Sequence, residues 1–265
     1  MTDKKVVLVT GASRGIGLAA VRRLVYGTPS IPASRVVTLS RTLTEDLAAL
    51  AREKPDDLVT VQGDVTSEKD NLSARDEALK RWGRLDALIL NAGIVDHQMC
   101  ADLTPERFLH VLNVNTVSLA LTVRIALPEL RKSHGSVVFV SSGSATSNYS
   151  SWAAYNASKA AMNAYARTLA NEESDIACFS IRPGVVDTDM QVLIRSTDQM
   201  PSAQHAKFLG LHKEGKLVPA DKPAQVLAAL ATKGTRSSPT LPDGTHPGAL
   251  GAFMSWDDPV CQDLV

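Results

Sequence analysis

The sequence predicts one α/β domain, a doubly wound parallel sheet with helices on both faces. Apolar runs of strand length alternate with helical stretches along the 265 residues, which is the order of parallel strands joined by right-handed crossover helices. Most of these runs are continuously apolar and not alternating, as expected of strands covered on both faces. The length suits a single large domain with a sizeable core, so we expect one domain over residues 1–265.

Strands and helices can be placed in order along most of the chain. The expected strands lie at 6–10, 35–40, 58–62, 85–91, 136–141 and 177–182. The expected helices lie between them, at about 15–26, 44–53, 68–82, 105–132 and 152–172. Polar residues broken by proline and glycine follow, and we expect residues 187–218 to form a lid over the substrate. Glycine, proline and serine then dominate, so residues 234–265 are expected to be rich in coil.

The charge balance and the cysteines exclude several classes of partner. Basic and acidic residues number 28 each, so no broad field attracts nucleic acid or an anionic membrane. We find no apolar run long enough to cross a bilayer, and therefore expect no membrane partner. Three widely spaced cysteines argue against a disulfide framework and suit the cytoplasm. The histidines show no metal-ligand spacing with cysteines or acids, so we expect no metal.

A glycine-rich turn follows the first expected strand and opens the first expected helix. Residues 10–17 are Thr-Gly-Ala-Ser-Arg-Gly-Ile-Gly, with a G-x-x-x-G-x-G spacing. Glycines let the backbone come close to a ligand, and a helix N-terminus offers free amides and a positive dipole end. This combination is typical of a pyrophosphate site in a Rossmann-type domain. The expected contacts are Gly11, Ser13, Arg14, Gly15, Ile16 and Gly17.

Polar or flexible residues directly follow four of the expected strands. They are Gly11, Asn91, Ser142 and the pair Pro183-Gly184. Ligands of doubly wound sheets bind beyond the carboxyl ends of the strands. We therefore expect these residues to converge on a single site at that edge.

Tyr155 and Lys159 supply acid–base chemistry. They lie four residues apart on an expected helix, so they share a face. A free tyrosine titrates at about pH 10, too high for easy proton exchange at neutrality. A neighbouring ammonium and an oxidised nicotinamide favour the phenolate and lower this pKa, so Tyr155 can give a proton to a carbonyl or take one from an alcohol. The glycine turn and this pair together indicate a nicotinamide-dependent oxidoreductase.

Taken together, the motifs resemble the short-chain dehydrogenase/reductase family over nearly the whole chain. The matching stretches are residues 10–17, Asp64-Val65, Asn91-Ala92-Gly93, Asn113-Val114-Asn115, Ser141-Ser142, Tyr155-x-x-x-Lys159 and Pro183-Gly184. Residues 127–131, 215–218 and 255–259 are similar to the sepiapterin reductase and benzil reductase branch of that family.

The resemblance implies four catalytic residues: Asn115, Ser142, Tyr155 and Lys159. Ser142, thirteen residues before Tyr155, would hold the substrate oxygen and stabilise developing charge. Lys159 would also hold the nicotinamide ribose. Asn115 would hold a water that links Lys159 to solvent.

An arginine after the second expected strand favours NADP (NADPH) as the cofactor. An acid at this position usually binds the ribose hydroxyls of NAD, whereas arginine suits the 2′-phosphate of NADP. The chain has Ser40-Arg41 there and no acid, and Arg14 in the turn could reach the same phosphate. The resemblance assigns the remaining contacts: adenine to Asp64 and Val65, the ribose side to Asn91, Ala92 and Gly93, and the carboxamide and phosphates to Pro183, Gly184, Val186 and Thr188.

The leading hypothesis is an NADPH-dependent carbonyl reductase acting on a small-molecule ketone or diketone. An NAD-linked alcohol dehydrogenase is an alternative, but it would need an acid near residue 40. A cofactor-binding regulatory protein without turnover is another, and the intact Ser142, Tyr155 and Lys159 argue against it.

We also expect a homo-oligomer, a dimer or a tetramer. The helices expected at 105–132 and 152–172 carry many apolar and small residues. In the family, these helices meet their copies across a two-fold axis. A monomeric protein is the alternative, because part of the branch is monomeric and the alanines could pack inside the domain.

Overall fold

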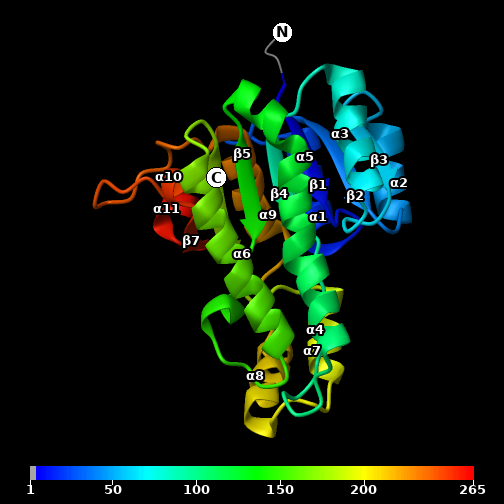
Figure 1. Cartoon of the computed structure of the whole chain (residues 1–265), viewed down its shortest axis with the longest axis vertical. Coiled ribbons are helices and arrows are strands. Elements are labelled where there is room, and N and C mark those ends of the chain that lie inside the picture. The colour runs from blue at the N-terminus through cyan, green and yellow to red at the C-terminus, as the bar shows by residue number, and fades with distance from the viewer. Residues whose placement is uncertain (1–3) are drawn as a thin grey trace.

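Parallel strands form the centre of the molecule (Figure 1). The computed structural model describes residues 4–265, so residues 1–3 of the predicted domain lie outside this range. Within the described residues, one sheet of seven strands has the order β3-β2-β1-β4-β5-β6-β7, and every neighbouring pair is parallel. The strands are β1 Val6–Thr10, β2 Arg35–Ser40, β3 Leu58–Gln62, β4 Ala87–Leu90, β5 Ser136–Val140, β6 Ala177–Arg182 and β7 Ala252–Ser255.

The strand order reverses between β1 and β4. From β1 the chain winds outward through β2 and β3, then returns to β4 on the other side of β1 and winds the opposite way. A crevice forms beyond the carboxyl ends of the strands at such a point. Thr10 and Leu90 are partners at these ends. The glycine turn after β1 and Asn91 after β4 therefore meet at the crevice.

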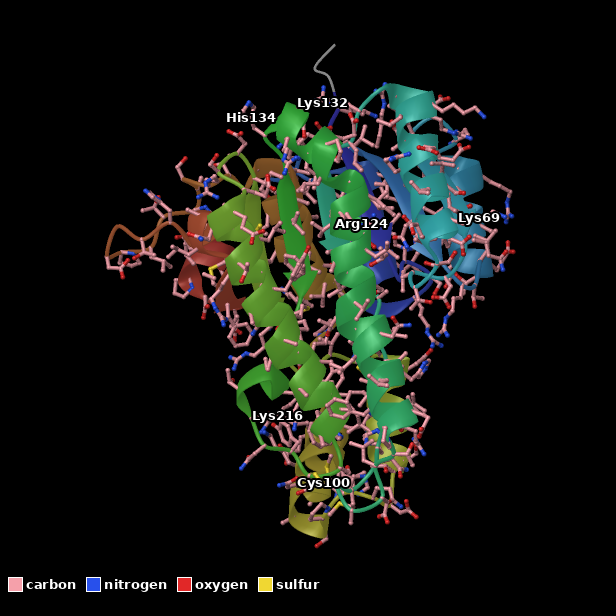
Figure 2. All side chains as sticks on the ribbon, viewed as in Figure 1. Lys69, Cys100, Arg124, Lys132, His134 and Lys216 are labelled. Atoms are coloured by element: carbon pink, nitrogen blue, oxygen red, sulfur yellow. The ribbon has the colours of Figure 1, made fainter. Side chains whose placement is uncertain are left out.

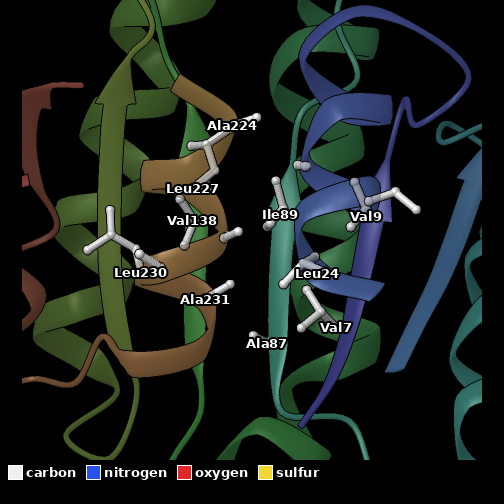
Figure 3. Packing of buried hydrophobic residues seen from close by; sticks show 14 of the residues in the cluster. Val7, Val9, Leu24, Ala87, Ile89, Val138, Ala224, Leu227, Leu230 and Ala231 are labelled. Atoms are coloured by element: carbon white, nitrogen blue, oxygen red, sulfur yellow. The ribbon is translucent and has the colours of Figure 1, made fainter. Parts of the chain in front are cut away.

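Helices cover both faces of the sheet, and each face has its own apolar core. Val7 and Val9 of β1 pack against α1 (Gly15–Tyr26), α2 (Glu45–Glu53) and α9 (Asp221–Lys233), and Figure 3 shows the part of this core between α1 and α9. Val6 and Leu8 belong to the opposite core, with α3 (Glu68–Trp82), α5 (Ser118–Ser133) and α6 (Ala153–Glu172). Successive strand side chains point to opposite faces. Strand β1 is therefore apolar from Val6 to Val9 because both of its faces are buried.

The helix expected at 105–132 is a continuous helical stretch with an irregular middle. It comprises α4 (Pro105–Leu112), a π-helical turn (Asn113–Val117) and α5. Contrary to our expectation, the stretch Pro105–Ser133 is long and apolar enough, by length and composition alone, to cross a membrane. Half of the residues in its most apolar part are buried inside the fold. The part that lies in α5 packs on the sheet through residues such as Val123 and Leu130, which accounts for its apolar character.

The C-terminal third contains more regular structure than expected. Helix α9 was not predicted, and residues 234–265, expected to be rich in coil, contain α10 (Pro247–Leu250), β7 and α11 (Pro259–Gln262). Strand β7 is only four residues long and directly follows a glycine- and proline-rich stretch, so its pattern is too short to be recognised. It extends the sheet by pairing with β6, from Phe179 with Ala252 to Arg182 with Ser255.

Two helices occupy the segment that was expected to be a lid. They are α7 (Asp189–Ser196) and α8 (Ser202–Lys213). Together with α4 they lie at one end of the molecule, beyond the carboxyl end of the sheet (Figure 1). A bridge between Val186 and Val218 joins the two ends of the segment. The segment is therefore a flap whose two ends are paired with each other at its base.

Candidate active site

The glycine turn after β1 is held by contacts that leave no room for side chains. Gly11 and Gly15 have φ angles of 65° and 55°, a region that favours glycine. A Cβ on Gly17 would lie 2.3 Å from the Gly11 carbonyl oxygen. Asn91 Nδ2 donates to the carbonyl oxygens of Thr10 and Gly11, at 3.2 and 2.9 Å. Asn91, expected on the ribose side, thus also stabilises the turn.

The start of α1 presents free hydrogen-bond donors. Within residues 4–265, the backbone N–H groups of Ser13, Arg14, Gly15 and Ile16 have no hydrogen-bond acceptor. Unpaired amides at the positive end of a helix dipole suit an anion such as a pyrophosphate. This donor set fits the nicotinamide cofactor that the motif predicts.

The residues expected at the adenosine end differ in their exposure. Ser40 is buried, and its hydroxyl oxygen accepts a hydrogen bond of 2.8 Å from the Ala12 N–H. Arg41 is exposed. Hydrogen bonds from Thr66, and to a smaller extent the charge of Arg41, hold the pKa of Asp64 below its usual range. Arg41, rather than Ser40, is therefore the exposed donor beyond β2, and it lies near the Asp64 carboxylate.

Arg14 contacts the lid segment and not the end of β2. Its Nη1 donates to Asp189 Oδ2 at 2.5 Å, and both side chains are exposed. Asp189 is the first residue of α7. The expected pairing of Arg14 with Arg41 around one phosphate thus requires Arg14 to leave this carboxylate.

Ser142, Tyr155 and Lys159 come together at the carboxyl end of β5. Ser142 precedes a short 3₁₀ turn (Gly143–Thr146), and the Tyr155 hydroxyl contacts its side chain. Lys159 Nζ lies 5.8 Å from the centre of the Tyr155 ring and donates to the Val140 carbonyl oxygen at 2.8 Å. The spacing of four on α6 and the loop after β5 therefore bring the expected acid, lysine and serine to one place.

Burial controls the protonation of Tyr155 and Lys159, which are 7% and 5% exposed. Burial raises the pKa of Tyr155 above its usual value, and the contact with Ser142 opposes this rise. Burial lowers the pKa of Lys159 to about 8. Among the described residues, desolvation is the largest influence on the pKa of Tyr155, and Lys159 is not among the groups that shift it. The Tyr155 hydroxyl therefore keeps its proton at neutral pH.

Asn115 fixes the segment that follows Gly93. Its Oδ1 accepts from the Ile94 N–H and its Nδ2 donates to the Ile94 carbonyl oxygen, each at 2.8 Å. Nδ2 also donates to Ser158 Oγ at 3.0 Å. A Cβ on Gly93 would lie 3.8 Å from Lys159 Nζ and 3.3 Å from Asn115 Oδ1. Gly93 thus leaves space beside Lys159. Asn115 positions the backbone next to Gly93, a role that the sequence did not reveal.

The remaining residues expected at the cofactor also lie around this edge. The Ala92 N–H donates to Thr10 Oγ1 at 3.2 Å, and Val65 is buried after β3. Pro183 follows β6, and Gly184 has a φ angle of 80°. A Cβ on Gly184 would lie 3.1 Å from the Trp256 indole nitrogen. The turn after β6 therefore depends on glycine to enter the lid segment.

Apolar and aromatic side chains surround Tyr155, and sequence reasoning had singled out neither Trp152 nor Phe208 among them. Trp152 packs edge-on against Tyr155, with ring centroids 5.6 Å apart, and Phe208 of α8 stacks on Trp152 at 5.6 Å. Met190 of α7 has its Sδ 4.0 Å from the Tyr155 hydroxyl oxygen. The only sequence signal was that Trp152 lies three residues before Tyr155 on the same helical face.

One histidine joins this cluster. His97 Nδ1 accepts a hydrogen bond of 3.0 Å from Trp152 Nε1, and burial lowers the pKa of His97. Among the described residues, no three His, Cys, Asp or Glu side chains are grouped as a metal site requires. His97 is therefore a neutral partner of the aromatic cluster and belongs to no metal-ligand set.

Comparison with known proteins places these features in context. A family model described as short chain dehydrogenase matches residues 5–199. An uncharacterized oxidoreductase of Schizosaccharomyces pombe is 38% identical over 259 residues, which cover 96% of this chain and 97% of that protein. A benzil reductase of Saccharomyces cerevisiae that forms (S)-benzoin is 36% identical over 267 residues, covering 96% of each chain.

A solved structure has a similar fold over nearly the whole length. It is a crystal structure of a short chain dehydrogenase/reductase from Saccharomyces cerevisiae, with a TM-score of 0.89 and 37% identity. The match covers 98% of this chain and 99% of that one. The resemblance therefore extends to the C-terminal segment, beyond the residues that the family model matches.

Proposed function

Since the chain belongs to the short-chain dehydrogenase family of oxidoreductases, whose members use a nicotinamide cofactor, we propose that it is an NADPH-dependent carbonyl reductase. One observation carries the proposal: the buried Tyr155 hydroxyl contacts Ser142, with Lys159 one helical turn further along α6. Reduction of a ketone needs a proton donor and a hydrogen-bond donor at the same oxygen. Tyr155 and Ser142 supply both.

The residues divide the chemistry between them. When bound, the reduced nicotinamide would supply the hydride. Tyr155 would give its hydroxyl proton to the carbonyl oxygen of the substrate as negative charge develops there. Ser142 would donate a hydrogen bond to the same oxygen. Lys159 would hold the ribose and, as an ammonium, stabilise the tyrosinate that remains.

The protonation of Tyr155 fits the role of proton donor in a reduction. Burial raises its pKa, so the hydroxyl keeps its proton at neutral pH. A general acid must carry a proton at the start of the step, whereas alcohol oxidation needs the phenolate. Tyr155 is thus in the protonation state that the reductive direction requires.

The adenosine end supports NADPH over NADH. No carboxylate stands at the end of β2, where Ser40 is followed by Arg41. The nearby Asp64 carboxylate already accepts hydrogen bonds from the Thr66 N–H and Oγ1 at 2.8 and 2.7 Å. The exposed Arg41 guanidinium is suited to a 2′-phosphate, and the amides at the start of α1 are suited to the pyrophosphate.

The aromatic cluster supports an aryl ketone or diketone as substrate. Trp152 and Phe208 stack beside the acid, and Met190 lies against its hydroxyl. Stacked rings and a flexible thioether favour flat apolar groups. The relative that reduces benzil, an aromatic diketone, supports the same class.

A turnover assay tests the proposal. The purified protein is incubated with NADPH or NADH and a panel of aliphatic ketones, aryl ketones, diketones and quinones. We expect NADPH oxidation with aryl diketones among the best substrates. No turnover with any carbonyl would favour the regulatory alternative, and faster alcohol oxidation with NAD than ketone reduction with NADPH would favour the dehydrogenase.

We expect the reductive kcat/KM to fall as the pH rises through about 8. Burial brings the pKa of Lys159 down to about 8, so its ammonium loses its proton there instead of near its usual value. Below that pH, Lys159 is charged and can stabilise the tyrosinate; above it, the charge is gone. Initial rates measured from about pH 6 to about pH 10 give the profile. Arginine keeps its charge over this range, so kcat/KM of Lys159→Arg should not fall near pH 8, even if the variant is slow. A wild-type profile that stays flat through pH 8 would contradict the assignment of this pH dependence to Lys159.

We also propose that the protein is a homo-oligomer. Leu109 of α4 and Val117 of the π turn are 62% and 56% exposed, and they border a hollow of about 420 Å³. On α6, Ala160 and Ala164 are exposed, as is Arg124 of α5, labelled in Figure 2. Exposed apolar patches often mark interfaces. In sedimentation, we expect a dimer or tetramer that Leu109→Asp weakens; a lone 28.3 kDa species would contradict this.

A further inference from the structure

The start of α7 rests on the glycine turn. Arg14 Nη1 donates to Asp189 Oδ2 at 2.5 Å. Beside this ion pair, a Cβ on Gly15 would lie 3.1 Å from Thr188 Cγ2, so the threonine methyl group packs on the bare glycine. Two consecutive residues of the lid segment therefore contact two consecutive residues of the turn.

The same end of α7 reaches the acid. Met190, which follows Asp189, has its Sδ 4.0 Å from the Tyr155 hydroxyl oxygen. The first two residues of α7 thus link the turn that receives the cofactor to the group that protonates the substrate. Only one peptide bond separates the residue that contacts the turn from the residue that contacts Tyr155.

The rest of the flap is anchored more firmly. Ile194, Met200 and Phe208 are buried in one cluster with Trp152 and Tyr155. By contrast, the side chains of Arg14 and Asp189 are 70% and 62% exposed. Exposed ion pairs contribute little to stability, whereas buried apolar clusters contribute much. A ligand can therefore displace the contact between Asp189 and Arg14 without breaking this buried cluster.

We propose that Asp189 competes with the 2′-phosphate of the cofactor for Arg14, so that binding of the phosphate releases the start of α7. The inference rests on the proposed preference for NADPH. A phosphate monoester carries up to two negative charges and accepts hydrogen bonds at three oxygens, whereas Asp189 offers one charge. The carboxylate occupies a guanidinium donor and also repels the phosphate. Asp189 therefore lowers the affinity for the phosphorylated cofactor.

Thermodynamic linkage makes the effect reciprocal. If the ion pair weakens phosphate binding by some factor, the bound phosphate weakens the ion pair by the same factor. The structure therefore couples occupation of the adenosine end to freedom of the helix that covers Tyr155. A ligand without the 2′-phosphate leaves the ion pair in place.

Calorimetric titration with 2′,5′-ADP and 5′-AMP tests the competition, because neither probe carries the nicotinamide. In Asp189→Asn we expect 2′,5′-ADP to bind about two- to fivefold more tightly than to wild type, with 5′-AMP unchanged. Asp187→Asn is the matched control: it removes the same charge from the same segment, and its side chain has no hydrogen bond within residues 4–265. In an Arg14→Ala background, Asp189→Asn should have no further effect.

Hydrogen exchange gives a second readout without catalysis. Saturating 2′,5′-ADP should speed amide exchange at the start of α7 in wild type and leave Asp189→Asn, already faster, unchanged. If wild type binds 2′,5′-ADP no better than 5′-AMP, the proposed NADPH preference fails and takes this inference with it. If wild type prefers 2′,5′-ADP but Asp189→Asn or exchange shows no change, the competition alone is overturned.

Discussion

Replacing Tyr155 with phenylalanine removes nearly all ketone reduction, with kcat about a hundred- to ten-thousandfold below wild type, while NADPH binding is unchanged. The substitution deletes the hydroxyl that contacts Ser142 and keeps the ring that packs edge-on against Trp152. The fold and the cofactor contacts are therefore preserved. Steady-state rates and NADPH titration by fluorescence are measured on the same preparation.

A nearby tyrosine provides the control for this result. Tyr149 also packs against Trp152, with centroids 5.0 Å apart, and its hydroxyl accepts from Lys207 at 2.9 Å. Tyr149→Phe removes a hydroxyl from the same aromatic cluster without touching Ser142, so we expect a near wild-type rate. An undiminished rate in Tyr155→Phe would show that Tyr155 is not the acid.

Exchanging Arg41 for aspartate reverses the cofactor preference. The change removes a charge-assisted contact worth about 1.5–3 kcal/mol, or roughly ten- to a hundredfold in affinity. It also adds a carboxylate that repels the 2′-phosphate and can accept the ribose hydroxyls of NADH. We therefore expect kcat/KM for NADPH to fall by roughly a hundredfold and that for NADH to hold or rise. Ser40 is left in place because its hydroxyl accepts from the Ala12 N–H and supports the turn.

Two further variants make the cofactor experiment specific. Arg41→Ala removes the donor without adding a charge, so its loss with NADPH should be smaller. Arg22→Asp makes the same charge change on the exposed side of α1 and should leave the ratio of the two cofactors unchanged at one fixed salt concentration. If the wild type prefers NADH, or if Arg41→Asp leaves the ratio of kcat/KM for the two cofactors unchanged, Arg41 does not determine the cofactor preference.

Local patterns were enough to predict six of the seven described strands and to place the candidate catalytic groups. The continuous apolar runs predicted β1, β2, β3 and β6 at the bounds that the structure shows. The helix period placed Tyr155 and Lys159 on one face, and parallel strands brought Ser142 to the same edge. Such patterns reflect backbone geometry, which acts over a few residues and is written directly in the chain.

Other features have weak local signals and were missed. Strand β7 has four residues, and it is held by its pairing with β6 and not by its own pattern. Asn115 was expected at the site as the holder of a water, but its bonds to both backbone groups of Ile94 were not predicted. Each depends on a partner that the local sequence does not name.

Tertiary structure decided how the site is covered and charged. Arg14 meets Asp189 across 175 positions of the chain, and Phe208 joins Trp152 from a helix that spacing could not relate to α6. The pKa of Lys159, about 8, and the raised pKa of Tyr155 come from burial by the assembled fold. The sequence by itself determined which chemical groups are present and on which elements; only packing determined their neighbours and their desolvation, because both depend on segments that are distant along the chain.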